Sequence, residues 1–247
     1  MKKSYLLIVL TFIVMQLSSY IGVPLFFQIG TKVLHIDPEQ MKVNAVGYWI
    51  LFSFSVGLAL VLFLLRKNEK YTKIEKDQPL PVGQSFTWAI IGIFMAFFAQ
   101  ISAGLVEKAI GINPGSENTQ QILQLIELFP AIVIISSIIG PILEEIVFRK
   151  VIFGSLYDRL PFWVAALLSS VIFALAHFEP VHIILYATMG FVFAFLYVMT
   201  KRIIVPIIAH VSMNTIVVIL QLFLVDKLEK YIEKTAQFVW WIGGFFS

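Results

Sequence analysis

Two glutamates and an arginine lie inside one of the most apolar stretches of the chain, residues 140–150, GPILEEIVFRK. A charge at the centre of a bilayer costs about 2.5–3.5 kcal/mol, so Glu144, Glu145 and Arg149 must face protein or water rather than lipid. Glu145 and Arg149 are four residues apart and share a helix face, so they can pair. Glu144 is rotated by about 100° from Glu145 and points elsewhere.

Two histidines in other apolar stretches could share a site with Glu144. His177 follows Phe173 by four residues, and Asn214 follows His210 by four. Each pair can therefore share a helix face, with the Phe173 ring walling a cavity. Because ionisable groups inside a membrane face one another or a wet cavity, the sequence predicts three helices that converge on one polar site.

This set of side chains is suited to the activation of water. A buried carboxylate whose protonation is tuned by burial and nearby cations can act as a general base near neutral pH. Glu144, His177 and His210 could instead bind zinc and leave a position for water. Asn214, together with a histidine, could stabilise the oxyanion of a tetrahedral intermediate.

Composition indicates an all-α, polytopic membrane bundle. Of the 247 residues, 59% are hydrophobic and 13% are charged, and the mean hydropathy is +0.90. Soluble domains carry about 25% charged residues. The chain has no cysteine, which excludes a thiol nucleophile, disulfides and thiolate metal sites. The expected surroundings are a lipid bilayer, and no nucleic-acid partner is expected.

Seven apolar segments approach the roughly 20 residues that a spanning helix needs. They are 5–27, 43–65, 86–106, 130–153, 161–177, 181–200 and 203–225. An amphipathic stretch at 122–128 predicts an interfacial helix. The tail, 226–247, has paired tryptophans that suit the interface and could form a short eighth segment. The predicted organisation is membrane helices over 1–125, a catalytic core over 126–225 and the tail.

The charged loops predict an orientation in a cell membrane. With the N-terminus in the cytoplasm, the loops that would lie inside hold more Lys and Arg than those outside, as the positive-inside rule requires. The first apolar segment follows two lysines and lacks a clear cleavage site, so we expect a retained helix rather than a signal peptide. A Phe- and Ile-rich, cysteine-free chain with short loops is typical of a bacterial protein.

Three motifs in this order resemble a known family. EEIVFR fits EExxxR, FALAH fits FxxxH and HVSMN fits HxxxN. Together, on separate membrane helices, they resemble the CPBP family, also called Abi, which joins CAAX prenyl proteases with bacteriocin-processing proteins. The resemblance covers about residues 126–224. It implies an intramembrane endopeptidase that acts on a membrane-associated peptide or protein, with a possible role in pheromone or bacteriocin maturation.

The resemblance also implies roles for the motif residues. Glu144 would activate water with help from His177, while His210 and Asn214 would bind the oxyanion or complete a metal site. The second glutamate and the arginine of EEIVFR would support the site. The family is often described as metalloproteases, but a glutamate-dependent protease without metal is the alternative. No HExxH zinc motif is present, so zinc is the one candidate cofactor and its binding is open.

Other interpretations remain. The EEIVFR charges could be an ion pair at a helix end, the protein could be a proton-coupled transporter or channel, or it could be a non-catalytic immunity or regulatory protein that keeps the fold. His182 is the alternative to His177 as the functional histidine. Glu179, between them, is expected to be a loop carboxylate, and His35 to be solvated. The region around 177–182 is expected to break the helix, because straight helices would place His177 and Glu144 at different depths.

Overall fold

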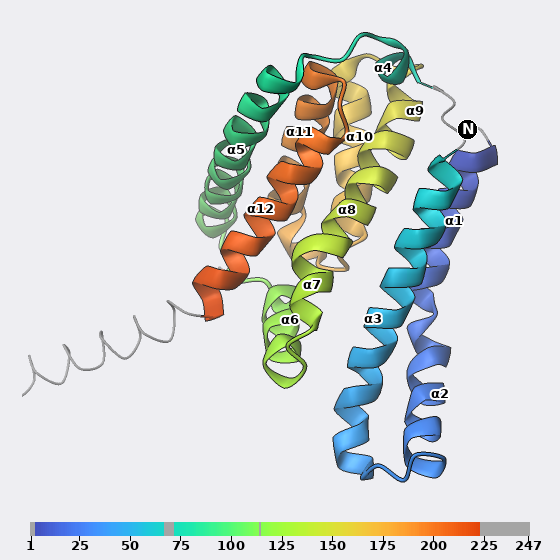
Figure 1. The fold of residues 1–247 in the computed structure, drawn as a ribbon. Coiled ribbons are helices and arrows are strands. Elements are labelled where there is room, and N and C mark those ends of the chain that lie inside the picture. The colour runs from blue at the N-terminus through green and yellow to red at the C-terminus, as the bar shows by residue number, and fades with distance from the viewer. Residues whose placement is uncertain (1–2, 67–71, 114, 223–247) are drawn as a thin grey trace, which may run out of the picture.

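The N-terminal half consists of two long helices that follow a bent pair (Figure 1). The computed structural model describes residues 3–66, 72–113 and 115–222, and every element in these ranges is helical. The elements of this half are α1 (Lys3–Leu17), α2 (Ser19–Lys32), α3 (Pro38–Leu65), α4 (Lys73–Lys76), α5 (Val82–Ala109) and α6 (Glu117–Leu128). The amphipathic helix expected at 122–128 is thus present as α6, and its place at a membrane interface stays a prediction.

The C-terminal half carries the three motifs on helices that α5 flanks (Figure 1). One continuous helical run consists of α7 (Ile132–Ile134), the π-helix η1 (Ile135–Ile139), α8 (Gly140–Glu144), the π-helix η2 (Glu145–Phe153) and α9 (Gly154–Tyr157). It is followed by α10 (Phe162–Leu175), the 3₁₀ turn η3 (Pro180–His182), α11 (Ile183–Thr200) and α12 (Ile204–Leu220). The predicted tail, 226–247, lies outside the described residues.

The all-helical membrane fold is confirmed. In the described residues, 3 helices are long and apolar enough to cross a membrane, namely α3, α5 and the run Pro180–Thr200. The pair α1 and α2, bent by 48°, would make up to 4. The other two apolar helices, α10 and α12, are shorter than the roughly 20 residues of a full span, and π turns interrupt the run after residue 132. The count of seven therefore stays a prediction.

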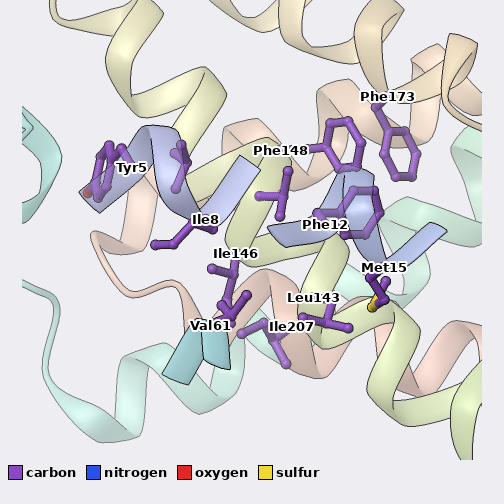
Figure 2. Packing of buried hydrophobic residues seen from close by; sticks show 12 residues of the cluster. Tyr5, Ile8, Phe12, Met15, Val61, Leu143, Ile146, Phe148, Phe173 and Ile207 are labelled. Atoms are coloured by element: carbon purple, nitrogen blue, oxygen red, sulfur yellow. The ribbon is translucent and has the colours of Figure 1, made fainter. Parts of the chain in front are cut away.

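Helix α1 packs along the continuous helical run α7 to α9, called here the motif helix because it carries EEIVFR (Figure 2). Tyr5, Ile8 and Phe12 are buried in one cluster with Phe148 and Val151 of η2. The rings of Phe12 and Phe148 meet edge to face, with centroids 5.7 Å apart. In lipid the association of helices depends on such close packing rather than on water exclusion. The first helix therefore braces the segment that carries EEIVFR.

Helices α10 and α11 approach closely through small residues. Ala165, Ala166 and Ser170 of α10 are buried, as is Gly190 of α11. A Cβ added at Gly190 would lie 3.0 Å from Cβ of Ser170, which is closer than nearly all real contacts. This small-residue contact is typical of membrane helix pairs and fixes the position of the helix that bears FALAH.

The loops predicted to lie inside meet at one end of the bundle (Figure 1). The backbone N–H of Lys73 donates to Asp158 Oδ1 at 2.7 Å. Leu80 N–H donates to Thr200 O at 3.1 Å, and Arg202 Nε donates to Leu80 O at 2.7 Å. The alternation of loops between two ends thus agrees with the sequence, while the cytoplasmic side remains a prediction.

Glu75 of α4 ties this end to the motif helix. Its carboxylate accepts from Tyr5 Oη at 2.7 Å and from Lys150 Nζ, and it closes a capping box with Thr72. Burial alone would raise the pKa of Glu75, but the hydrogen bonds from Lys150 and Tyr5 outweigh burial and lower this pKa below its usual value. Glu75 therefore stabilises the fold in its ionised form.

Glu75→Gln is expected to lower the free energy of unfolding by about 1.5–3 kcal/mol at neutral pH, since hydrogen bonds to a charged group are lost. Because the folded-state pKa is lowered, the contribution is present above the unfolded pKa of about 4.3 and is lost as the pH falls through the folded value. Thermal unfolding in detergent across this range measures the difference. Glu127→Gln, at an exposed site on α6, is the control. A difference that grows towards acid pH would contradict the role of the carboxylate.

Candidate active site

The motif helix contains a π turn, η1, just before the two glutamates. The backbone N–H of Gly140 donates to Ile135 O, one residue further back than in an α-helix. Pro141 has no N–H, so neither residue serves the carbonyl of Ser136. Asn214 Nδ2 donates to this carbonyl at 3.3 Å. Gly140 and Pro141 thus leave the Ser136 carbonyl free to accept a hydrogen bond from Asn214. This bond holds α12 against the motif helix.

Glu145 joins two of the three motifs. Its side chain is fully buried, with Oε1 2.9 Å from His210 Nδ1 and Oε2 3.3 Å from Arg149 Nε. The sequence predicted the contact with Arg149, whereas the contact with His210 was not foreseen. A carboxylate at Nδ1 orients an imidazole and, in the neutral ring, leaves Nε2 as the acceptor. Glu145 is therefore placed to hold His210 in one orientation.

Glu144 lies on the other side of the same imidazole. Its Oε2 is 3.8 Å from His210 Nε2, too long for a direct hydrogen bond. Its side chain is 23% exposed, whereas that of Glu145 is 0% exposed. The two adjacent glutamates thus face opposite nitrogens of His210. Glu145 is in the interior, and Glu144 is partly exposed.

Aromatic rings enclose the buried charge. The guanidinium carbon of Arg149 lies 4.1 Å from the centre of the Phe173 ring and 5.3 Å from that of Phe193. The Phe193 ring also stacks on His210, with centroids 4.7 Å apart. Among the described residues, no nitrogen of Arg149 makes a hydrogen bond, so Glu145 at 3.3 Å balances its charge. Such a buried pair is costly to break, because the remaining charge would have no partner.

His177 lies beside this cluster. Its Nδ1 is 2.8 Å from Phe173 O, so Nδ1 donates and Nε2 remains available. Its ring meets Phe173 edge to face at 4.6 Å and stacks on Tyr186 at 4.0 Å. The Phe173 ring also meets His210 edge to face, with centroids 6.2 Å apart, so it lies against both histidines. Within the described part of the chain no hydrogen bond or ion pair joins His177 to Glu144.

The break expected around 177–182 is present. Helix α10 ends at Leu175, Phe178 has φ 57°, and Pro180–His182 form a 3₁₀ turn. The 14 residues of α10 rise only about 21 Å, less than the thickness of a hydrocarbon core. The end of α10 lies beside the motif of α12, since the ring centroids of Phe173 and His210 are 6.2 Å apart.

His182, the alternative to His177, belongs to a different contact. Its Nδ1 is 2.7 Å from Glu107 Oε2, and its Nε2 is 3.1 Å from Gly115 O. Glu107 also accepts from the backbone N–H of Leu185 at 3.0 Å, close to the start of α11. Glu107 thus joins α5 to the start of α11, and neither it nor His182 has a hydrogen bond to a motif residue in the described part of the chain. The sequence analysis gave Glu107 no role, although a carboxylate near the end of an apolar span was the available signal.

The donors as placed do not fit a zinc ion. In residues 3–66, 72–113 and 115–222, no three His, Asp or Glu side chains form a group that could hold a metal. The Nδ1 atoms of His210 and His177 are hydrogen-bonded to Glu145 and to Phe173 O, which leaves each Nε2 as the atom that could bind a metal. Zinc binding by Glu144, His177 and His210 stays a prediction.

These features define a helical membrane protein with a buried glutamate–histidine site. The sequence profile described as "Type II CAAX prenyl endopeptidase Rce1-like" matches residues 126–216. "Putative membrane peptidase YdiL" of Bacillus subtilis (strain 168) is 47% identical over 248 residues, 100% of both chains. "Membrane-embedded CAAX protease MroQ" of Staphylococcus aureus (strain USA300) is 36% identical over 206 residues, 81% of this chain and 83% of that protein. No solved structure gives a significant match.

The chain therefore belongs to the Rce1-like CAAX prenyl endopeptidase family, a family of membrane peptidases. Its relatives are bacterial, in agreement with the composition.

Proposed function

We propose that the protein is an intramembrane endopeptidase in which Glu144 activates the attacking water. The observation that carries this proposal is the placement of two adjacent glutamates on opposite nitrogens of His210, at 2.9 Å and 3.8 Å. The buried Glu145 orients the ring, and the part-exposed Glu144 lies 3.8 Å from Nε2 without a direct hydrogen bond to it. This division of roles resembles the way an acidic residue orients a catalytic histidine in hydrolases.

The proposed reaction proceeds through a tetrahedral intermediate. Glu144 takes a proton from water while the water oxygen bonds to the carbonyl carbon of the scissile peptide. The second amide hydrogen of Asn214, beyond the one donated to Ser136 O, stabilises the oxyanion, together with Nε2–H of His210 in its imidazolium form. The C–N bond then breaks as the proton passes from Glu144 to the leaving amine. His177, with Nε2 available, assists the water.

The proposed substrate is an amphipathic, membrane-associated peptide or protein precursor. The apolar walls of the site and the apolar outer faces of the helices suit a chain that arrives through the bilayer or its interface. Because the relatives are bacterial, we favour a secreted peptide, such as a pheromone or bacteriocin precursor, over a prenylated protein as the substrate.

The test compares membranes that contain equal amounts of wild type, Glu144→Gln and the exposed-site control Glu39→Gln. Mass spectrometry of membrane-bound and secreted peptides measures products and precursors. A product that disappears in Glu144→Gln alone, while its precursor accumulates, is the expected result. Identical peptide profiles would overturn the proposal in favour of a non-catalytic regulatory protein.

A further inference from the structure

The ring of Tyr186 lies flat against the ring of His177. Their centroids are 4.0 Å apart and their planes differ by 24°. At its edge, the imidazole donates a hydrogen bond from Nδ1 to Phe173 O at 2.8 Å. These two contacts fix both the plane and the rotation of the ring, so they determine where Nε2 points.

Tyr186 is itself held by Glu179. The Tyr186 hydroxyl donates to Glu179 Oε2 at 2.7 Å. The same oxygen accepts from Ser116 Oγ at 2.7 Å, and Oε1 accepts from the backbone N–H of Asn118 at 2.8 Å. Glu179 is a loop carboxylate, as the sequence predicted. It joins the start of α6, the first turns of α11 and the loop that carries His177.

The backbone between His177 and Glu179 is strained at Phe178. Phe178 has φ 57°, in the left-handed region, which costs a residue with a side chain about 1–2 kcal/mol. Its ring is 84% exposed and gives little packing in return. Such a conformation persists only where its surroundings impose it, and here His177 is fixed on one side and Glu179 on the other.

We propose that Tyr186 and Glu179 are positioning residues for His177, with Tyr186 setting the plane of the imidazole and Glu179 holding Tyr186 through its hydroxyl. This inference rests on the proposed function, because it assigns a use to the orientation of His177. It also attaches the amphipathic helix α6 to the site, through Ser116 and Asn118.

The first test follows the histidine itself and does not need activity. The chain has 4 histidines, so a ring-proton NMR spectrum of histidine-labelled protein in micelles is simple, and His177→Asn assigns the signal. Tyr186→Leu removes the stacked ring and is expected to move the His177 signal downfield. Tyr186→Phe keeps the ring but loses the hydrogen bond to Glu179, and it is expected to move the signal less than Tyr186→Leu does. Tyr197→Leu, at a buried tyrosine of the same helix α11 in a separate cluster, is the matched control.

The second test measures cleavage of an internally quenched peptide copied from the precursor that accumulates in Glu144→Gln cells. Tyr186→Leu is expected to lower kcat by about 10- to 100-fold with little change in KM, the effect of a misplaced catalytic group. Glu179→Ala is expected to lower kcat less, and Glu179→Gln, which still accepts hydrogen bonds, to recover much of that loss. Tyr197→Leu is expected to keep kcat per folded molecule.

Equal losses of kcat in Tyr186→Leu and Tyr197→Leu, or an unmoved His177 signal in Tyr186→Leu, would overturn the positioning role. If wild type cleaves no peptide, the proposed function fails, and the NMR signal still decides whether Tyr186 orients His177.

Discussion

Glu144→Gln is expected to lower kcat by about a hundred- to ten-thousand-fold, the range for removal of a general base. The amide has the same shape but cannot take a proton from water. Because the Glu144 side chain is 23% exposed and lies 3.8 Å from His210 Nε2, the free energy of unfolding should change by only about 1 kcal/mol. Peptide cleavage and thermal unfolding in the same detergent measure the two effects.

The adjacent Glu145→Gln is the matched comparison, and its main expected effect is on stability rather than on kcat. Glu145 is fully buried and contacts both Arg149 and His210, so its neutral variant leaves a buried guanidinium without compensation. The expected loss is about 3–5 kcal/mol of stability. If Glu144→Gln destabilises as much as Glu145→Gln, or retains wild-type kcat, then the assignment of the base to Glu144 is wrong.

The local part of the site could be predicted from the sequence. Helical spacing predicted that Glu145 and Arg149 could pair and that Phe173 and His177 would share a face, because residues four apart do so whatever the rest of the fold does. The length of the apolar segments predicted the helices, and the depth mismatch of His177 predicted the break after α10. These inferences used only helix geometry and the thickness of a bilayer.

Contacts between helices could not be predicted in the same way. Helical spacing fixes the direction of a side chain on its own helix but not the rotation of that helix against another, so the bond from His210 to Glu145 was not foreseen. The π turn at Ile135–Ile139 alters the rotation of everything after it, and helical spacing does not predict such a turn. Glu179 gained its role from donors that lie 61 to 63 residues away in sequence.

Arg149→Met is expected to cost about 3–5 kcal/mol, because it leaves Glu145 charged in the interior. The double variant Glu145→Gln with Arg149→Met removes both charges and should recover most of that loss, since an uncharged pair of similar volume needs no compensation. The recovery appears as a strongly non-additive double-mutant cycle in thermal unfolding. Turnover should stay low in the double variant, because His210 loses the carboxylate at Nδ1.

Arg149→Lys separates charge from shape in the same site. Lysine keeps the positive charge beside Glu145 but loses the flat guanidinium that lies 4.1 Å from the Phe173 ring centre. We expect an intermediate loss of about 0.5–2 kcal/mol, the range of a cation–π contact. Additive single variants in the Glu145–Arg149 cycle, or a double variant less stable than either single one, would show that the buried pair does not set the stability of the site. Full stability recovery together with full turnover would show instead that Glu145 is not needed to orient His210.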